Sequence, residues 1–126
     1  MENFLKNTFN NEAEIYDSTA RFLMLNYDQL LTEVVSEIDF SEDDCFCILD
    51  AGCGTGNLTR MIRNKFPKAT IYGIDFSEDM LKRAERKVDG VTFLYGDIFD
   101  AEDLPIPAFD LIVVSFVFHN FHTIKV

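Results

Sequence analysis

The chain has 126 residues, of which 48% are hydrophobic, and its formal net charge at pH 7 is −11. These values predict one globular domain with a modest core and exclude an intrinsically disordered chain. The excess of 22 acidic over 11 basic residues argues against a nucleic-acid partner, which needs clustered lysines and arginines.

The three cysteines of the chain are Cys45, Cys47 and Cys53. An odd number, without a signal peptide at the start of the sequence, predicts a reducing, cytoplasmic location. No second cysteine pair or nearby histidine completes a ligand set, so we predict no metal site. No apolar run approaches the roughly 20 residues of a membrane-spanning helix, so we also predict no membrane span.

Residues 1–44 are predicted to form an N-terminal helical cap. From Tyr27 onward, apolar residues recur with the helical period at Leu30, Leu31, Val34, Val35 and Ile38. The acidic stretch SEDD at 41–44 is predicted to end this helix in a turn.

Residues 45–126 alternate between strand-like and helix-like segments. The predicted strands are 45–49, 70–74, 91–95 and 109–116; the predicted helices are 57–66 and the segment from a Ser77 cap to Gly90. Residues 102–107, which contain two prolines, are predicted to form a loop. This alternation is typical of an α/β protein with a parallel sheet and helices packed on its faces.

Polar residues stand at or just after the carboxyl ends of the four predicted strands. They are Asp50, Asp75, Asp97 and Ser115. Because ligands of parallel sheets bind beyond these ends, we expect the four residues to cluster around a ligand.

The glycine-rich loop after the first predicted strand, DAGCGTG at 50–56, discriminates between ligands. It lacks the lysine of a phosphate-binding P-loop, and its Gly-x-Gly-x-Gly spacing differs from the Gly-x-Gly-x-x-Gly of dinucleotide folds. Asp50 at its start would repel a diphosphate and attract a positive charge. S-adenosylmethionine, which carries a sulfonium and an ammonium but no phosphate, fits this loop better than NAD. An NAD-dependent oxidoreductase is the less favoured alternative.

Four motifs together resemble the cofactor half of class I, Rossmann-like S-adenosylmethionine-dependent methyltransferases. They are LDAGCGTG, IYGIDFSEDML, YGDI and FDLIVVSFVFHN, in the order that the family has. The resemblance covers residues 48–120 and implies a partial three-layer α/β/α fold, with N-terminal helices and strands 1–4. Within the family the chain looks most similar to small-molecule methyltransferases of the quinone-biosynthesis type, which implies a small-molecule methyl acceptor and S-adenosylhomocysteine as the product.

The resemblance also implies a set of cofactor-binding residues. They are Asp50, Ala51, Gly52, Gly54, Gly56, Asp75, Phe76, Met80, Asp97, Ile98, Ser115, Tyr16 and Arg21. In this set, Asp75 accepts from the ribose hydroxyls and Asp97 from the adenine amino group. Tyr16 and Arg21, in the stretch AEIYDSTAR, cover the methionine end of the cofactor.

The catalytic residues are unknown from the sequence. His119 follows the fourth predicted strand and is a weak candidate for a general base, and a structural histidine is the alternative. An activated methyl donor can react through orientation alone, so no base is strictly required. A non-catalytic cofactor-binding or interaction module is the alternative function.

The last predicted strand, 109–116, comes shortly before the end of the sequence at Val126. Without a later strand, this apolar segment is expected to form an unprotected sheet edge. We therefore expect the chain to be an excerpt or truncated product of a longer protein; the alternative is that a homo-oligomer or another partner covers this edge.

Overall fold

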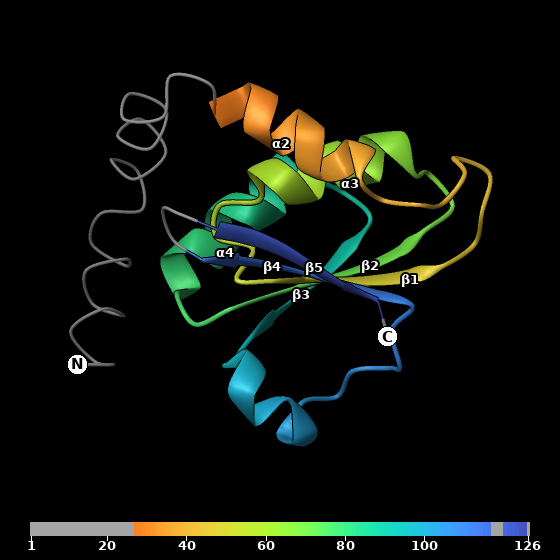
Figure 1. Cartoon of the computed structure of the whole chain (residues 1–126). Helices are drawn as coiled ribbons and strands as arrows, with labels where there is room; N and C mark the ends of the chain where they lie inside the picture. Colours follow the sequence, from red (N-terminus) through yellow and green to blue (C-terminus); the bar gives the residue numbers. More distant parts are fainter. Residues whose placement is uncertain (1–26, 117–119, 126) are drawn as a thin grey trace.

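The computed structural model of this chain describes residues 27–116 and 120–125, with side chains for residues 27–99 and 102–114 (Figure 1). Its elements follow in the order α2 (Tyr27–Ser36), β1 (Cys47–Ala51), α3 (Asn57–Lys65), β2 (Thr70–Asp75), α4 (Glu78–Lys87), β3 (Val91–Tyr95), the 3-10 helix η1 (Ile98–Asp103), β4 (Leu111–Phe116) and β5 (Asn120–Lys125).

β1 lies in the middle of a sheet with the strand order β3-β2-β1-β4-β5. It pairs in parallel with β2 and with β4, and β2 pairs in parallel with β3. The predicted parallel sheet is therefore confirmed. The carboxyl ends of β1 to β4 consequently lie at one edge of the sheet, where the predicted site residues are found.

Two hydrogen bonds join the starts of β1 and β4. The N–H of Cys47 donates to Asp110 Oδ2 at 2.9 Å, and the N–H of Asp110 donates to the Cys47 carbonyl at 2.9 Å. They set the register in which Ile48 lies opposite Leu111.

The prediction that the fourth strand forms a bare sheet edge was wrong. β5 pairs with β4 in antiparallel orientation, with Ser115 opposite Phe121 and Leu111 opposite Lys125. The backbone of β4 is thus hydrogen-bonded on both sides, and the argument for a partner on this strand no longer applies.

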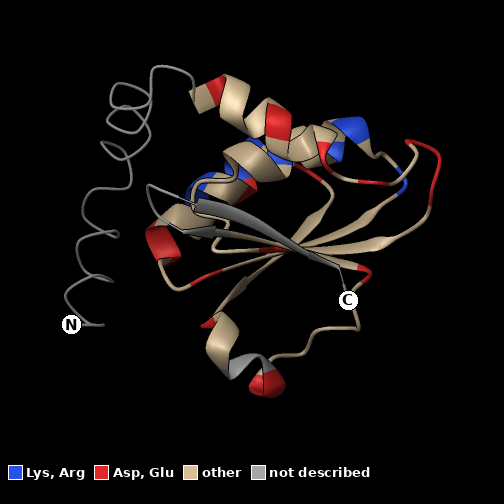
Figure 2. Cartoon of the chain, viewed as in Figure 1, with Lys and Arg blue, Asp and Glu red and all other residues tan. Residues whose placement is uncertain are grey.

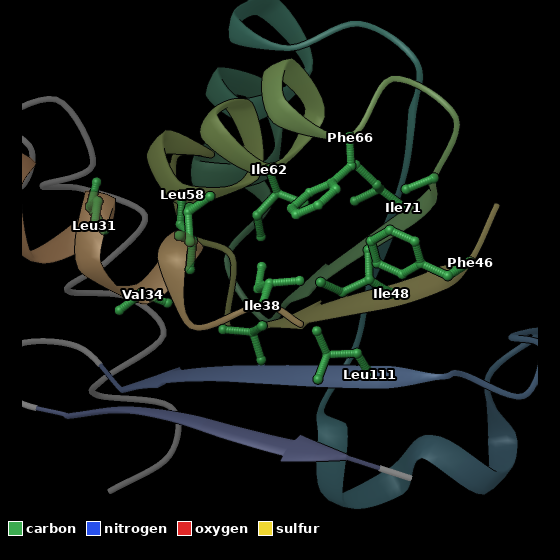
Figure 3. Packing of buried hydrophobic residues seen from close by; sticks show 13 residues of the cluster. Leu31, Val34, Ile38, Phe46, Ile48, Leu58, Ile62, Phe66, Ile71 and Leu111 are labelled. Atoms are coloured by element: carbon green, nitrogen blue, oxygen red, sulfur yellow. The ribbon is translucent and has the colours of Figure 1, made fainter. Parts of the chain in front are cut away.

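The larger of the two hydrophobic cores lies between the sheet and helices α2 and α3 (Figure 3). Ile48 of β1 and Ile71 of β2 point from the sheet toward Ile62 of α3. Phe66, directly after α3, is also fully buried and meets the Phe46 ring edge to face at 5.2 Å. Of the predicted cap over residues 1–44, the structure describes the part from Tyr27 onward, which shares this core.

The second core lies on the opposite face of the sheet. Leu49 and Ala51, which alternate with Ile48 along β1, belong to it together with Ile74 and Phe109. The alternation of strand side chains explains why one strand serves both cores. η1 and the loop after it cover this second face, where α2, α3 and α4 are absent (Figure 1). Part of the predicted loop 102–107 therefore belongs to a 3-10 helix.

The ends of α3 and α4 follow from local chemistry. Ser77 caps α4, since its hydroxyl accepts from the Met80 N–H at 3.4 Å, as the sequence predicted. Two acidic residues in the first turn and two basic residues in the last turn of α4 suit the helix dipole. α3 ends at Lys65, two residues before Pro67, which cannot continue a helix.

Charge is distributed unevenly over the two faces of the sheet (Figure 2). The coloured lysines and arginines of Figure 2 lie on α3, α4 and the turn between α3 and β2, whereas residues 96–110 include acidic residues but no lysine or arginine. In the part of the chain that the structure describes, no helix is long and apolar enough to cross a membrane.

Candidate functional site

The glycine loop between β1 and α3 is anchored to the end of β2. The N–H groups of Gly52 and Cys53 donate to the Ile74 carbonyl at 2.7 and 3.1 Å. Gly52, Gly54 and Gly56 have φ values of 74°, 56° and 88°, in the left-handed region that favours glycine. The three glycines are therefore required by the course of the loop, which brings its backbone beside Asp75.

Asp75, at the carboxyl end of β2, ties the glycine loop to the start of α4. Its Oδ2 accepts from the Gly54 N–H at 2.8 Å, and its Oδ1 accepts from the Ser77 N–H at 2.9 Å. The residue is only 7% exposed. Burial raises the pKa of this carboxyl, and hydrogen bonds from the N–H groups of Gly54, Ser77 and Phe76 oppose that rise.

Asp50, at the carboxyl end of β1, is the most deeply buried acid of the described residues, with 0% exposure. Its Oδ2 accepts from the Thr59 hydroxyl at 2.6 Å, whereas Oδ1 has no hydrogen-bond partner among the residues that the structure describes. Burial raises the pKa of Asp50 to about 7; the Thr59 hydrogen bond lowers it, and the nearby Asp75 charge raises it further. A buried carboxylate with one unoccupied oxygen is costly unless a ligand compensates it.

The third strand end contributes Gly96, Asp97 and Ile98. The Gly96 N–H donates to the Asp75 carbonyl at 3.0 Å, which joins this turn to β2. Asp97 Oδ1 accepts from the Phe99 N–H at 3.0 Å, so one of its oxygens shapes the turn into η1. Ile98 packs on the second core. Asp97 therefore has a structural role in this turn, and its contact with a cofactor stays a prediction.

Three further predicted residues lie close to the glycine loop. Met80 is 3% exposed, and its sulfur lies 3.7 Å from where a Cβ on Gly54 would be. Phe76, directly after Asp75, is half-buried. The side chain of Ala51 is buried in the second core, so only its backbone faces the loop.

Four predicted residues are not characterised at the level of side chains. Tyr16, Arg21 and His119 lie outside the described residues. Ser115 lies in β4, at the predicted strand end, but its side chain is not among those described. The proposed roles of these four residues stay predictions.

The sequence did not predict two polar contacts of the glycine loop. One is the Thr59–Asp50 hydrogen bond. The other joins Lys87, at the end of α4, to Asn57 Oδ1 and to Thr55 Oγ1, the latter at 3.2 Å. Thr59 and Asn57 are polar residues on the buried side of an amphipathic helix, and this position is the signal that could have indicated them.

The thiol of Cys53 is the remaining reactive group of the glycine loop. Burial raises the pKa of the Cys53 thiol well above its usual value, which keeps it protonated and unreactive. Within the described ranges, no group of three or more His, Cys, Asp or Glu residues could hold a metal ion.

The sequence of this chain is similar to that of known methyltransferases. Residues 48–125 match the methyltransferase domain family. The chain is 37% identical over 123 residues to a malonyl-acyl-carrier-protein O-methyltransferase of Priestia megaterium, covering 95% of this chain and 43% of that protein. It is 34% identical over 119 residues to a demethylmenaquinone methyltransferase of Thermotoga maritima, covering 90% of this chain and 48% of that protein.

Solved structures share the arrangement of the sheet. A magnesium protoporphyrin IX methyltransferase from Synechocystis, solved with bound S-adenosylmethionine, superimposes with a TM-score of 0.70 at 20% identity, covering 89% of this chain and 60% of that one. An amino pentose methyltransferase from Micromonospora echinaspora gives a TM-score of 0.64 at 26% identity, covering 81% of this chain and 42% of that one. These likenesses confirm the predicted Rossmann-like fold.

The chain spans less than half of the length of the two curated relatives. The match nevertheless includes β1 from Ile48 onward, the whole of β2 to β5 and the whole glycine loop. The chain therefore belongs to the methyltransferase domain family.

Proposed function

We propose that this chain binds S-adenosylmethionine at the carboxyl ends of β1, β2 and β3, as the cofactor-binding half of a methyltransferase. Two buried carboxylates beside a glycine loop carry this proposal. Among the described residues, neither Asp50 nor Asp75 has an ion-pair partner. A ligand with two positive charges and no phosphate compensates such a site, whereas a diphosphate would meet repulsion.

The residues present fit the parts of this cofactor. The unoccupied Oδ1 of Asp50 is an acceptor for the ammonium group. Asp75 keeps acceptor capacity for the two ribose hydroxyls, because each carboxylate oxygen can accept more than one hydrogen bond. Asp97 and Ile98 are assigned to the adenine, and Phe76 and Met80 to the nucleoside beside it. When bound, S-adenosylmethionine supplies a methyl group activated by the sulfonium.

The chain's own contribution to the reaction is to bind and orient the cofactor. Gly52 and Gly54 are proposed to let the backbone approach the ligand without an intervening Cβ. A Cβ on Gly56 would instead face Ala84, so Gly56 contributes by letting α3 start close to α4. The hydrogen bonds of Asp75 to Gly54 and Ser77 fix the carboxylate before the ligand arrives, which reduces the entropy lost on binding. Tyr16 and Arg21 are proposed to cover the methionine end, and His119 is kept as a weak candidate for a base.

A small molecule is the proposed methyl acceptor. Among the relatives, one is named for demethylmenaquinone and another for a malonyl group on acyl-carrier protein, so the acceptor differs within the family. We keep the similarity to small-molecule methyltransferases of the quinone-biosynthesis type as the finer proposal, with the acceptor itself unidentified. A division into a cap over residues 1–44 and a cofactor domain over 45–126 is also proposed. The three cysteines are free thiols, which supports a cytoplasmic location.

Titration of the chain with S-adenosylhomocysteine and with NAD by isothermal calorimetry tests the proposal. We expect saturable binding of S-adenosylhomocysteine and none of NAD. Binding of NAD without binding of S-adenosylhomocysteine would overturn the proposal in favour of an oxidoreductase. Transfer of labelled methyl groups to a panel of quinone and carboxylate acceptors then distinguishes an enzyme from a non-catalytic binding module.

Asp75→Ala is expected to weaken S-adenosylhomocysteine binding by about 1–3 kcal/mol, the scale for removing a hydrogen bond to a charged group. The loss has two sources: the acceptor for the ribose, and the fixed position of the Gly54 N–H. The measurement is calorimetric affinity at pH 7.5. Glu85→Gln, an exposed substitution on α4, is the matched control and should bind like the wild type. Equal affinity of Asp75→Ala and wild type would refute the assigned role.

A further inference from the structure

Thr59, on the first helix after the glycine loop, is the polar residue that holds Asp50. Its side chain is fully buried, and its hydroxyl donates to Asp50 Oδ2 at 2.6 Å across nine residues of sequence. Threonine hydroxyls within helices commonly donate to the carbonyl four residues earlier. Here the hydroxyl donates instead to a side chain of the neighbouring strand, so this contact links α3 to the end of β1.

This contact leaves the two oxygens of Asp50 in different situations. Oδ2 is engaged by Thr59, whereas Oδ1 is buried and has no partner among the described residues. The last torsion of an aspartate side chain has a broad energy well, so an unrestrained carboxyl would rotate. A donor fixed on a packed helix removes this freedom and keeps Oδ1 in one direction.

We propose that Thr59 is a positioning residue for the cofactor, holding Asp50 Oδ2 so that Oδ1 accepts from the ammonium group of bound S-adenosylmethionine. The inference rests on the proposed function, since it needs that ligand in the site. Thr59 does not touch the reacting atoms in this role. Its hydroxyl acts through Asp50 in two ways. It fixes the orientation of the carboxyl group, and it favours the ionised carboxylate, since a hydrogen bond to the charged form stabilises that form.

Two ligands separate this role from a general effect on the fold. S-adenosylhomocysteine carries the ammonium group, and 5′-methylthioadenosine has the same nucleoside without the amino-acid end. Thr59→Val keeps the shape of the side chain and removes the hydroxyl. We expect it to lower the affinity for S-adenosylhomocysteine about tenfold, which corresponds to about 1.4 kcal/mol, and to leave the affinity for 5′-methylthioadenosine unchanged.

Thr59→Ser is the matched control, because it keeps the hydroxyl and loses only a methyl group. It should bind S-adenosylhomocysteine within about twofold of the wild type. If Thr59→Val does not fold, Thr59→Ala provides the same comparison with a smaller side chain. Thermal unfolding of each variant, followed by circular dichroism, shows which variants are folded at the temperature of the titration.

The pH dependence of binding gives a second readout that a merely structural role would not change. Among the residues that the structure describes, the titratable groups that face Asp50 are Asp75 of β2 and the thiol of Cys53. Wild-type affinity for S-adenosylhomocysteine should rise with pH as Asp50 ionises. In Thr59→Val this rise should move to higher pH, because the hydrogen bond that lowers the pKa of Asp50 is lost.

These titrations test the positioning role of Thr59 separately from the proposed function. An equal loss of affinity for both ligands in Thr59→Val, or unchanged affinity for S-adenosylhomocysteine, would overturn the positioning role. Failure of the wild-type chain to bind either ligand would instead overturn the proposed function. A pH profile that is identical in Thr59→Val and in the wild type would also count against the inference.

Discussion

Gly56→Ala is expected to lower the free energy of unfolding by about 2–5 kcal/mol, the sum of a left-handed backbone cost and an overpacking cost. Gly56 precedes α3 with φ of 88°, a conformation that L-residues rarely adopt. A Cβ at this position would lie 3.0 Å from Ala84 Cβ and 3.1 Å from Ala84 Cα. Because Ala84 is fully buried on α4, neither helix can move away without opening the core.

Gly90→Ala is the matched control for this substitution. Gly90 has φ of 73°, but an added Cβ would meet only the Arg63 side chain, at 3.6 Å. It should therefore show the backbone cost of about 1–2 kcal/mol without the clash. Urea unfolding of both variants separates the two contributions. Equal destabilisation would show that the close approach of α3 to α4 does not limit this position.

Asp50→Asn is expected to change the pH dependence of stability. The pKa of Asp50 is about 7 in the folded chain and about 3.8 in the unfolded chain. Below about pH 4 the carboxyl is protonated in both states. Between about pH 4 and 7 the unfolded chain releases the proton and the folded chain retains it, so folding stability falls as pH rises. Above about pH 7 both states are ionised and the penalty is constant.

The asparagine variant lacks this titration and keeps an oxygen that can accept from Thr59. Relative to the wild type, its free energy of unfolding should therefore rise by about 1 kcal/mol per pH unit between pH 4 and 7. Urea unfolding at intervals of half a pH unit measures the difference. A difference that does not vary with pH would contradict the raised pKa. The same variant should lose affinity for S-adenosylhomocysteine, as is usual where stability and function compete.

The sequence predicted the strand and helix order well where hydrophobic patterns are strong. The strand 91–95 coincides with β3, and the predicted helix 57–66 differs from α3 by one residue. The first strand was predicted two residues too early, because Asp50 is polar and a polar residue usually ends an apolar run. In the structure Asp50 lies within β1 and is buried there, since Thr59 supplies a partner.

Two elements were missed for physical reasons. β5, NFHTIK, mixes polar and apolar residues, and a pattern of this kind does not indicate a buried strand. Its position depends on pairing with β4, which the composition of the segment does not reveal. η1 is a short 3-10 helix, a type of element with no strong periodicity.

The sequence predicted the site residues from their positions at strand ends. The structure adds the hydrogen bonds that these residues make. The positions of Asp50, Asp75 and Asp97 at or just after the ends of predicted parallel strands were sufficient to place them at one edge of the sheet. The hydrogen bonds from Gly54 to Asp75 and from Thr59 to Asp50 depend on how α3 packs on the sheet. Such contacts between elements leave no periodic signal in a single sequence.

The central position of β1 has a consequence for the order of folding. β1 joins β2 through a crossover of roughly 20 residues, whereas its contact with the start of β4, from Cys47 to Asp110, spans 63 residues. Closing the longer loop costs roughly 1 kcal/mol more in chain entropy. We therefore expect β1, α3 and β2 to assemble before β4 docks. The glycine loop, Asp50, Thr59 and Asp75 all belong to this early unit, so this part of the proposed cofactor site can form while β4 is still unfolded.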